Sequence, residues 1–339
     1  MNAPIVTTRD RTKFIGGSDA AAVMGLSPWA TPVELWQQKT GRVPKPDPDP
    51  AALRRYERGH RLEPFIREMA IAKLQDMGLQ VELLACNETY VDPEHPFLAC
   101  EIDFELSITG TLVIGDEEFA FDGEHINADA KSVTGFARKK WGETDTEDVP
   151  IEYAAQFMHG LMVTGRRLCL VAALRSFDDV DIFWTLRDDE TIAAMRPKLV
   201  SFWIDHVLGD TPPDPIVFDD IKALFPRDDG STVEATDDIA AMVERLRMVK
   251  AEIKAREDIA EDLQFRIGDF ISPHAILRFK GAEIATWRAQ SDTRVSNDLL
   301  AAAEIYERKD GEFVRIDDPV GAFKRTKVIR VLRLKKPKA

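Results

Sequence analysis

The chain has 339 residues, 45 of them basic and 59 acidic, so its formal net charge is −14 with neutral histidines. At roughly 150 residues per domain, this length predicts one large domain or two modest ones. The acidic balance argues against a nucleic-acid-binding coat over the whole surface. It leaves room for a basic channel, because attraction to phosphates depends on where the lysines and arginines lie.

The sequence also predicts where the protein is located and which roles its cysteines do not have. The longest apolar run, residues 168–174, is far short of the roughly 18 residues that cross a bilayer. The N-terminus MNAPIVTTRDRTKF has no apolar segment of a secretory signal. Cys86, Cys100 and Cys169 lack CxxC spacing, which argues against a disulfide framework and against zinc or iron–sulfur ligation. We therefore expect a cytoplasmic protein with no membrane span.

Helices are predicted to dominate the first part of the chain. A short helix is expected over residues 18–25. In residues 31–34 a threonine N-cap, a proline at the first helical position and a glutamate at the third form a capping box, so a second helix begins there and ends at Gly41. A longer helix is expected over residues 51–77, where Pro64 predicts a kink or a restart.

The hydrophobic period then changes to two. Apolar and polar or small residues alternate over residues 98–104, which is typical of a half-buried strand. Further strands are expected at residues 80–91, 111–122, 126–133, 167–175 and 180–187. Further helices are expected at residues 136–142, 151–164 and 188–207. Helices before, within and after a mixed sheet predict an α/β core.

A Pro- and Asp-rich stretch between residues 210 and 230 predicts a domain boundary without regular structure. Beyond it, residues 234–268 place apolar side chains at helical spacing among alternating charges, which predicts a long exposed helix. A small β-containing tail follows, and its residues 324–338 include eight basic and no acidic residues. The expected organisation is a domain over residues 1–212, a linker over 213–231 and an extension over 232–339.

Asp129 and Lys131 are the most informative pair of residues. On a strand, residues two apart share a face, so their side chains project together while the small residues between and beside them point the other way. The strand that bears Asp103 can add a second carboxylate. Magnesium is commonly held by one or two carboxylates plus a substrate phosphate, and a nearby lysine stabilises charge that develops on that phosphate. The pattern indicates metal-dependent hydrolysis of a phosphodiester.

Five stretches in order along residues 8–205 form a more specific pattern. They are residues 14–29 (FIGGSDAAAVMGLSPW), 58–64 (RGHRLEP), 97–104 (FLACEIDF), 129–131 (DAK) and 149–165, which begins VPIEYAAQ and ends VTG. Through them the chain resembles the phage lambda exonuclease and YqaJ-like viral recombinase family, within the PD-(D/E)xK nuclease superfamily. The resemblance implies a restriction-endonuclease-like α/β core, a mixed central sheet flanked by helices, with a C-terminal helical and small β extension.

The resemblance implies where a metal would bind. Asp103, Asp129 and the carbonyl of Ala130 would be its ligands. Two departures from the family pattern bear on this assignment: the acid of the (D/E)xK motif is the shorter Asp129, and Asp103 is followed by phenylalanine where the family usually has glycine. Asp122 is followed by glycine and is the competing candidate, although it stands only seven residues before Asp129.

The resemblance also implies a catalytic group. Lys131 would be the catalytic lysine, Glu63 would reach a metal-bound water from its helix, and Gln156 would complete the site from another helix. A solvated helix residue is the alternative for Glu63, and a surface amide is the alternative for Gln156. His159, on the same helix face as Gln156, is interpreted as a structural residue.

Arg11 and Ser18 match the family's binding site for a terminal 5′-phosphate, which uses a serine in the glycine-rich signature and an arginine seven residues before it. A surface charge is the alternative for Arg11, and a simple helix cap is the alternative for Ser18. The carboxylate of Asp19, next to Ser18, predicts repulsion of a phosphate.

Taken together, the resemblance implies a Mg²⁺-dependent DNA exonuclease of phage or prophage recombination, in which Mn²⁺ can substitute. It would resect double-stranded DNA ends from a 5′-phosphate and leave 3′ single strands. Its implied partners are a single-strand annealing protein and further copies of itself in a homo-oligomeric ring, in the cytoplasm of a bacterial host. Two alternatives stay open: an endonuclease of the same superfamily, or a non-catalytic DNA-binding protein on a decayed nuclease fold.

Overall fold

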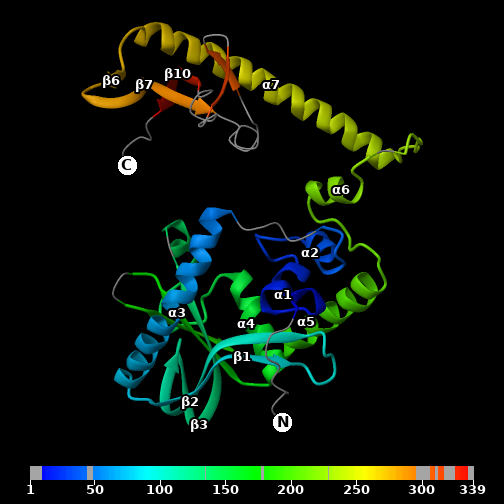
Figure 1. Ribbon diagram of the computed structural model, residues 1–339, viewed down its shortest axis with the longest axis vertical. Helices are drawn as coiled ribbons and strands as arrows, with labels where there is room; N and C mark the ends of the chain where they lie inside the picture. The colour runs from blue at the N-terminus through cyan, green and yellow to red at the C-terminus, as the bar shows by residue number, and fades with distance from the viewer. Residues whose placement is uncertain are drawn as a thin grey trace. The chain divides into compact units, whose positions relative to one another are not determined.

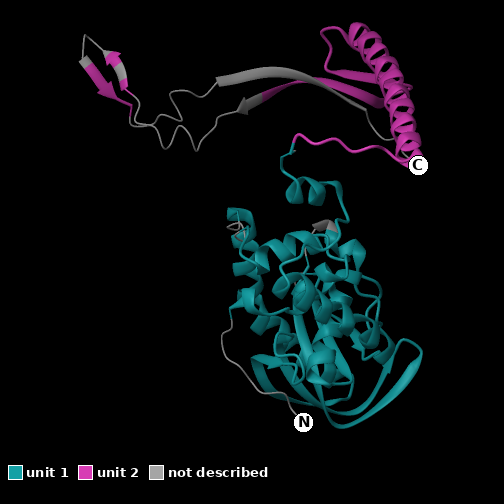
Figure 2. Cartoon of the chain, turned by 90° about the vertical axis from the view of Figure 1, so that its right-hand side faces the viewer, with its two compact units in different colours: residues 1–229 teal, residues 230–339 magenta. Residues whose placement is uncertain are grey.

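The computed structural model describes residues 10–43, 49–133, 135–176, 179–227, 229–294, 306–309, 312–316 and 325–334. The chain divides into two compact units, residues 1–229 and residues 230–339 (Figure 2), and each is considered by itself. The division falls within the expected linker. Part of that linker nevertheless forms a helix, α6 (Phe218–Leu224), because the buried carboxylate of Asp220 accepts the backbone N–H groups of Ile216 and Val217 at its start.

Unit 1 contains a mixed sheet of five strands in the order β1-β2-β3-β4-β5. Its strands are β1 (Gln80–Val91), β2 (Ala99–Ile114), β3 (Glu117–Ser132), β4 (Leu168–Leu174) and β5 (Asp181–Leu186). Neighbouring strands are antiparallel except β3 and β4, which are parallel and joined through α4 (Ile151–Thr164). This architecture confirms the expected α/β class.

Helices cover both faces of the sheet (Figure 1). On one face, Ile66, Ala70 and Leu74 of α3 (Pro50–Asp76) pack against β2, β3 and β4. On the other face α4 packs through Phe157 and Leu161. All seven residues of β4 are buried, because a strand covered on both faces is apolar throughout.

Shorter helices surround α4. They are the 3₁₀ turn η1 (Arg11–Lys13), α1 (Gly17–Val23), α2 (Pro32–Lys39), the 3₁₀ helix η2 (Gly135–Lys140) and α5 (Asp189–Ser201). α2 begins as expected: the Thr31 hydroxyl accepts the Glu34 N–H at 3.1 Å, and the Glu34 carboxylate accepts the Thr31 N–H at 2.9 Å. These two backbone N–H groups, which have no partner within the helix, are thereby hydrogen-bonded.

The structure corrects three expected elements. The strands expected at residues 98–104 and 111–122 belong to one hairpin, in which β2 and β3 are joined by a two-residue turn with Gly115 at φ 59°. Glu105 continues the polar side of the alternation within β2, where it is buried and lies 2.9 Å from Arg166, which neutralises its charge. α3 runs through Pro64 without interruption, since Pro64 lies on its exposed side, where water can replace the lost hydrogen bond. The helix expected at residues 188–207 ends as α5, and the π-helical turn η3 (Phe202–Leu208) follows it.

Unit 2 begins with the long helix α7 (Asp237–Ile271), as the charge and apolar spacing predict. A three-stranded sheet follows, in the order β10-β7-β6, with β6 (Ile276–Phe279), β7 (Ala282–Arg294) and β10 (Arg325–Leu334). A separate hairpin consists of β8 (Tyr306–Lys309) and β9 (Glu312–Arg315). Most of the basic tail forms β10, while residues 324 and 335–338 lie outside the described part of the chain.

Among the described helices, none combines the length and the apolar character that a membrane span requires.

His159 gives the fold of unit 1 a specific dependence on pH. It is fully buried on α4, and neither ring nitrogen has a hydrogen-bond partner among the described residues. Burial lowers its pKa from 6.5 to about 4; the carboxylates of Asp19 and Asp92 oppose this change, while Arg196 adds to it. Between these pH values the unfolded chain binds a proton that the folded chain excludes, so the free energy of unfolding falls as the pH falls.

We expect the substitution His159→Met to remove this part of the acid sensitivity. Between pH 7.5 and pH 4 the wild-type protein should lose about 3 kcal/mol more unfolding free energy than the variant, at about 1.4 kcal/mol per pKa unit. Urea unfolding of both proteins at a series of pH values measures the difference. Other groups that titrate in this range contribute equally to both proteins, so parallel pH profiles would show that His159 does not carry the effect.

Candidate active site

Asp129 and Lys131 lie side by side near the end of β3. The Lys131 ammonium is 2.5 Å from Oδ1 of Asp129, and both side chains face α4. The same ammonium lies 5.3 Å from the ring centre of Tyr153 and 5.5 Å from that of Phe157. The alternate residues of β3 pack against the α3 side of the sheet, where small side chains allow close approach. The strand geometry therefore places the pair as the sequence predicts.

Asp103 joins this pair from β2. Its Oδ2 accepts the backbone N–H of Ala130 at 2.9 Å, which ties the carboxylate to the strand between Asp129 and Lys131. Asp122 lies seven residues before Asp129 on the same strand, about 23 Å away at the usual rise per residue, and its side chain is exposed. The structure thus brings Asp103, and not Asp122, to Asp129.

The electrostatics of the group favour a bound cation. Burial raises the pKa of Asp129 to about 7; Lys131 opposes this rise, while the carboxylates of Asp103 and Glu63 add to it. Burial alone would lower the pKa of Lys131, but Asp129 and Asp103 outweigh burial and raise the pKa above its ordinary value. Lys131 is therefore a cation at neutral pH. A cation between the two carboxylates would relieve their repulsion.

Gln156 contacts the group from α4. Its Nε2 donates to Oδ2 of Asp129 at 3.3 Å. α1 abuts this side chain at Gly17, where an added Cβ would lie 2.9 Å from Cγ of Gln156. Glycine at this position therefore lets the glycine-rich segment approach the carboxylates closely.

Glu63 is the least closely connected of the expected residues. It lies on α3, and its carboxylate is 3.1 Å from Nδ1 of His60. Its charge raises the pKa of Asp129, so it is within electrostatic reach of the group. Ala130 contributes its backbone N–H to Asp103, and a metal-facing role for its carbonyl stays a prediction.

Arg11 and Ser18 meet at the start of α1. The Arg11 guanidinium donates to the Ser18 hydroxyl at 3.0 Å. Ser18 is not the helix cap, because the N-cap is Gly16, whose N–H is accepted by Asp19 at 3.0 Å. The Asp19 carboxylate is also 2.7 Å from the ammonium of Lys39, which offsets the repulsion that Asp19 would exert on a phosphate.

A cavity of about 590 Å³ opens beside five of the expected residues, while Glu63, Ala130 and Lys131 are not among the residues that line it. Its lining includes Arg11, Ser18, Asp103, Asp129 and Gln156. A cavity with convergent polar groups and a carboxylate of perturbed pKa is the usual form of an active site.

The structure adds residues that the sequence pattern did not single out. Asn127 also lines the cavity, and its Oδ1 accepts a hydrogen bond from Arg166 at 2.7 Å. Arg166 donates in addition to Tyr90 and to Glu105, both at 2.9 Å. This buried network fixes β1, β2 and β3 beneath the cavity. Tyr153 near the site could have been found from the sequence, because it stands three residues before Gln156 and therefore shares its helix face.

The donor set suits a hard divalent cation. It consists of carboxylate oxygens, and two carboxylates are sufficient for magnesium when a substrate phosphate supplies further oxygens. Among the described residues no three His, Cys, Asp or Glu side chains form a ready metal cluster.

Comparisons with known proteins agree with the motifs. Residues 8–167 match a family model described as YqaJ-like viral recombinase domain. The uncharacterized protein YqaJ of Bacillus subtilis (strain 168) is 26% identical over 311 residues, which cover 88% of each chain. An alkaline exonuclease from Laribacter hongkongensis is similar in structure, with a TM-score of 0.40 and 17% identity, over 59% of this chain and 91% of that chain. A phage related exonuclease from Haemophilus somnus 129PT is also similar in structure, with a TM-score of 0.36 and 11% identity, over 58% of this chain and 96% of that chain.

Proposed function

We propose that the protein is a Mg²⁺-dependent DNA exonuclease of phage or prophage recombination, on the premise that residues 8–167 match the family model described as YqaJ-like viral recombinase domain, in agreement with the five motifs. It resects duplex DNA from 5′-phosphorylated ends and leaves 3′ single strands. The observation that carries this proposal is that Arg11 and Ser18 line the same cavity as Asp103, Asp129 and Gln156. Groups suited to a terminal phosphate and groups suited to a metal thus face one space.

Each residue of the group has a definable part in phosphodiester hydrolysis. Held by Asp103 and Asp129, Mg²⁺ or Mn²⁺ would supply Lewis-acid neutralisation of charge on the scissile phosphate. Lys131 is protonated at neutral pH, so it stabilises negative charge that develops on the phosphate and does not act as a base. Gln156 orients Asp129, and the rings of Tyr153 and Phe157 restrict the position of the ammonium.

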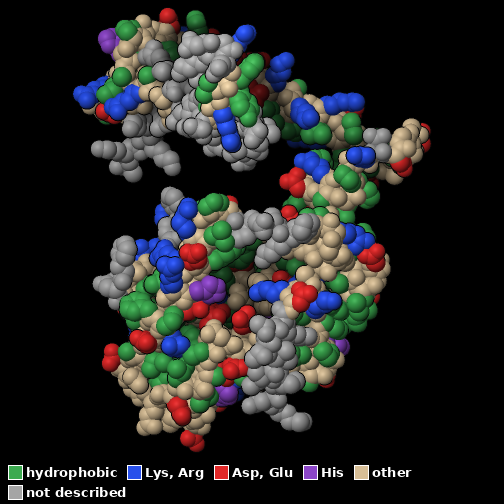
Figure 3. Space-filling model, viewed as in Figure 1, with side chains coloured by type: hydrophobic (Ala, Val, Ile, Leu, Met, Phe, Trp, Pro, Cys, Tyr) green, Lys and Arg blue, Asp and Glu red, His purple; other side chains and the backbone are tan. Residues whose placement is uncertain are grey.

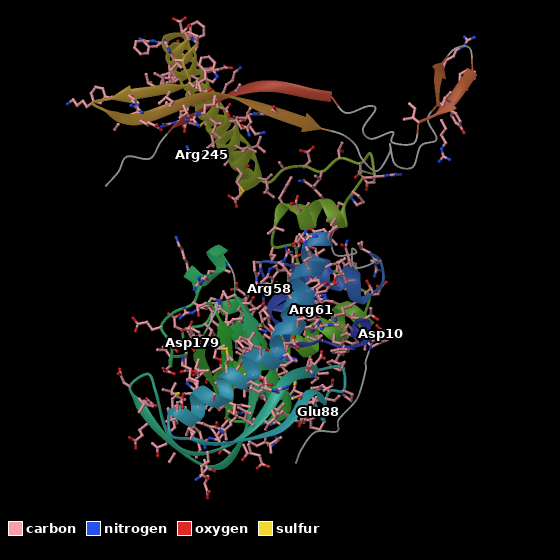
Figure 4. The ribbon with its side chains drawn as sticks, turned by 60° about the vertical axis from the view of Figure 1, so that its left-hand side comes forward. Asp10, Arg58, Arg61, Glu88, Asp179 and Arg245 are labelled. Atoms are coloured by element: carbon pink, nitrogen blue, oxygen red, sulfur yellow. The ribbon has the colours of Figure 1, made fainter. Side chains whose placement is uncertain are left out.

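Basic surfaces of unit 1 suit contacts with the DNA backbone. Exposed arginines lie along the N-terminal half of α3, where Figure 3 shows basic side chains gathered and Figure 4 labels Arg58 and Arg61. A second basic group, Arg138, Lys139 and Lys140, is exposed on η2 shortly after β3. Such contacts neutralise phosphates without reading sequence, so binding should weaken steeply with salt.

The proposed polarity predicts a preference between DNA ends. The wild-type protein should degrade a linear duplex with 5′-phosphate ends faster than the same duplex with 5′-hydroxyl ends. The substitution Arg11→Ala should slow degradation of the phosphorylated duplex about 10- to 100-fold, because a hydrogen bond to a charged group contributes about 1.5–3 kcal/mol. Degradation of the hydroxyl duplex should change little. Initial rates on the two end-labelled duplexes measure the preference.

Two controls make this test specific. Arg54→Ala removes an exposed arginine of α3 and should slow both substrates by the same factor. A covalently closed circular duplex should resist the wild-type protein. Cutting of the circle as fast as the linear duplex would replace the exonuclease proposal with an endonuclease, and an undiminished end preference in Arg11→Ala would remove Arg11 from the phosphate site.

The partners of the reaction follow from the same proposal. Resection that leaves 3′ strands calls for a single-strand annealing protein to use them. A closed homo-oligomeric ring around the duplex would keep the enzyme on its substrate over many cycles. Both remain predictions of the proposed function.

A further inference from the structure

The long helix α7 of unit 2 (Figure 1) carries apolar side chains that are exposed along most of its length. Apolar residues recur along it at alternating spacings of three and four, which is the heptad pattern of a coiled coil. The two positions of each heptad that face a partner helix are called a and d. Here position a is occupied by Ile239, Leu246, Ile253 and Ala260, and position d by Met242, Val249, Arg256 and Leu263. Seven of these eight residues are apolar.

These seam residues face solvent in the described structure. Ile239, Met242, Leu246 and Leu263 are each at least half exposed. Among the described residues of unit 2, α7 has buried positions only near its C-terminal end, where Gly268 meets the Trp287 ring and Ile271 is buried. The unpaired seam, residues 239–263, is 25 residues long, about 37 Å at 1.5 Å per residue. A stripe of this length, left open to water, marks an interaction surface.

We propose that α7 pairs with α7 of a second copy of the chain in an antiparallel coiled coil. The charges beside the seam decide the orientation, because position g of one helix faces position e of the other in a parallel pair, whereas e faces e and g faces g in an antiparallel pair. A parallel pair would bring Arg245 against Lys250 and Glu252 against Glu257, both combinations of like charge. Figure 4 labels Arg245 on α7.

An antiparallel pair aligns these charges better. With Ile253 of one helix opposite Arg256 of the other, Lys250 faces Glu257 twice by symmetry. The same alignment brings Arg245 near Arg266, but Arg266 already has a partner on its own helix, Asp262, at 3.8 Å. This alignment therefore gives attraction at the centre and a weakened repulsion near the ends.

The seam layers of this alignment are mostly apolar. Successive a residues meet d residues of the partner, and each layer pairs two apolar side chains except the one in which Ile253 meets the long stem of Arg256. The layers are Ile239 with Phe270, Leu246 with Leu263, Ile253 with Arg256, Ala260 with Val249, and Ile267 with Met242. Phe270, 77% exposed in the single chain, gains a partner in this arrangement.

Disulfide trapping in the full-length protein tests both the pairing and its direction. The double variant Leu246→Cys, Leu263→Cys should form an interchain disulfide on mild oxidation, because an antiparallel pair places these positions in one layer. The single variant Leu246→Cys should not, because only a parallel pair brings two copies of position 246 together. Non-reducing electrophoresis, with the wild-type protein as control for its native cysteines, reports the outcome. Efficient cross-linking of the single variant would overturn the antiparallel arrangement.

Mass measurement provides the second test. The substitution Leu246→Glu should halve the molar mass found by light scattering or weaken self-association at least tenfold. Lys250→Glu and Glu257→Lys should each weaken it, the combined exchange should restore it, and Lys254→Glu, on the outer face, should leave it unchanged. A mass that Leu246→Glu does not alter would overturn the proposal and leave the seam to a different partner. Because position 246 lies outside the nuclease site, nuclease activity serves as the check that Leu246→Glu is folded.

Discussion

Replacing Lys131 by methionine is expected to slow DNA cleavage on the order of a thousandfold, the size of effect found when a preorganised group that stabilises transition-state charge is removed. The ammonium is 2.5 Å from Asp129 and lies 5.3 and 5.5 Å from the ring centres of Tyr153 and Phe157. Methionine keeps the length and much of the apolar stem but not the charge. Single-turnover cleavage of a 5′-phosphorylated duplex with Mg²⁺ measures the loss of chemistry apart from binding.

The fold should tolerate this change. Without Lys131 the pKa of Asp129 rises further, so the buried carboxyl can take up a proton instead of remaining an unpaired charge. Lys198→Met, on the exposed surface of α5, is the matched control and should cleave at the wild-type rate. Undiminished cleavage by a folded Lys131→Met protein would point to another site or a contaminant. Absence of cleavage in the wild-type protein would favour the non-catalytic alternative.

The pairing of Asp129 with Lys131 could be predicted from sequence because it depends on strand geometry alone. Two residues on one strand, separated by one, share a face whatever the rest of the fold does. The choice between Asp103 and Asp122 could not be made in this way. It depends on the register between β2 and β3, which ends with Phe104 opposite Ala128. Only the paired strands show which carboxylate reaches the N–H of Ala130.

Charge compensation across the chain was also beyond the sequence pattern. Asp19 predicts repulsion of a phosphate at Ser18, but Lys39, twenty residues later, supplies the opposing charge. Glu105 stands on the polar side of the alternation of its strand and is nevertheless buried, which Arg166, sixty-one residues later, makes possible. Patterns of local period reveal which residues share a face. They do not reveal a distant partner that makes a buried charge acceptable.

Replacing Asp103 by asparagine is expected to slow metal-dependent cleavage by a factor of about a hundred to a thousand. Asparagine has the same shape, and its amide oxygen can still accept the N–H of Ala130, so the link between the strands is retained. The loss of one of the two carboxylate charges weakens the binding of the metal. It also removes one cause of the raised pKa of Asp129, which should then fall. Cleavage rates over a range of Mg²⁺ and Mn²⁺ concentrations measure the effect.

Asp122→Asn is the matched control, since it makes the same chemical change on an exposed residue of β3. It should cleave DNA at the wild-type rate, and EDTA should stop both proteins. Thermal unfolding gives a reading that does not depend on activity: Mn²⁺ or Ca²⁺ should raise the melting temperature of the wild-type and Asp122→Asn proteins, because a ligand that binds the folded state stabilises it. The Asp103→Asn protein should show a smaller rise. If Asp122→Asn instead loses both cleavage and the metal-dependent rise, the metal site assigned to Asp103 and Asp129 is wrong, whatever the hydrogen bond to Ala130 suggests.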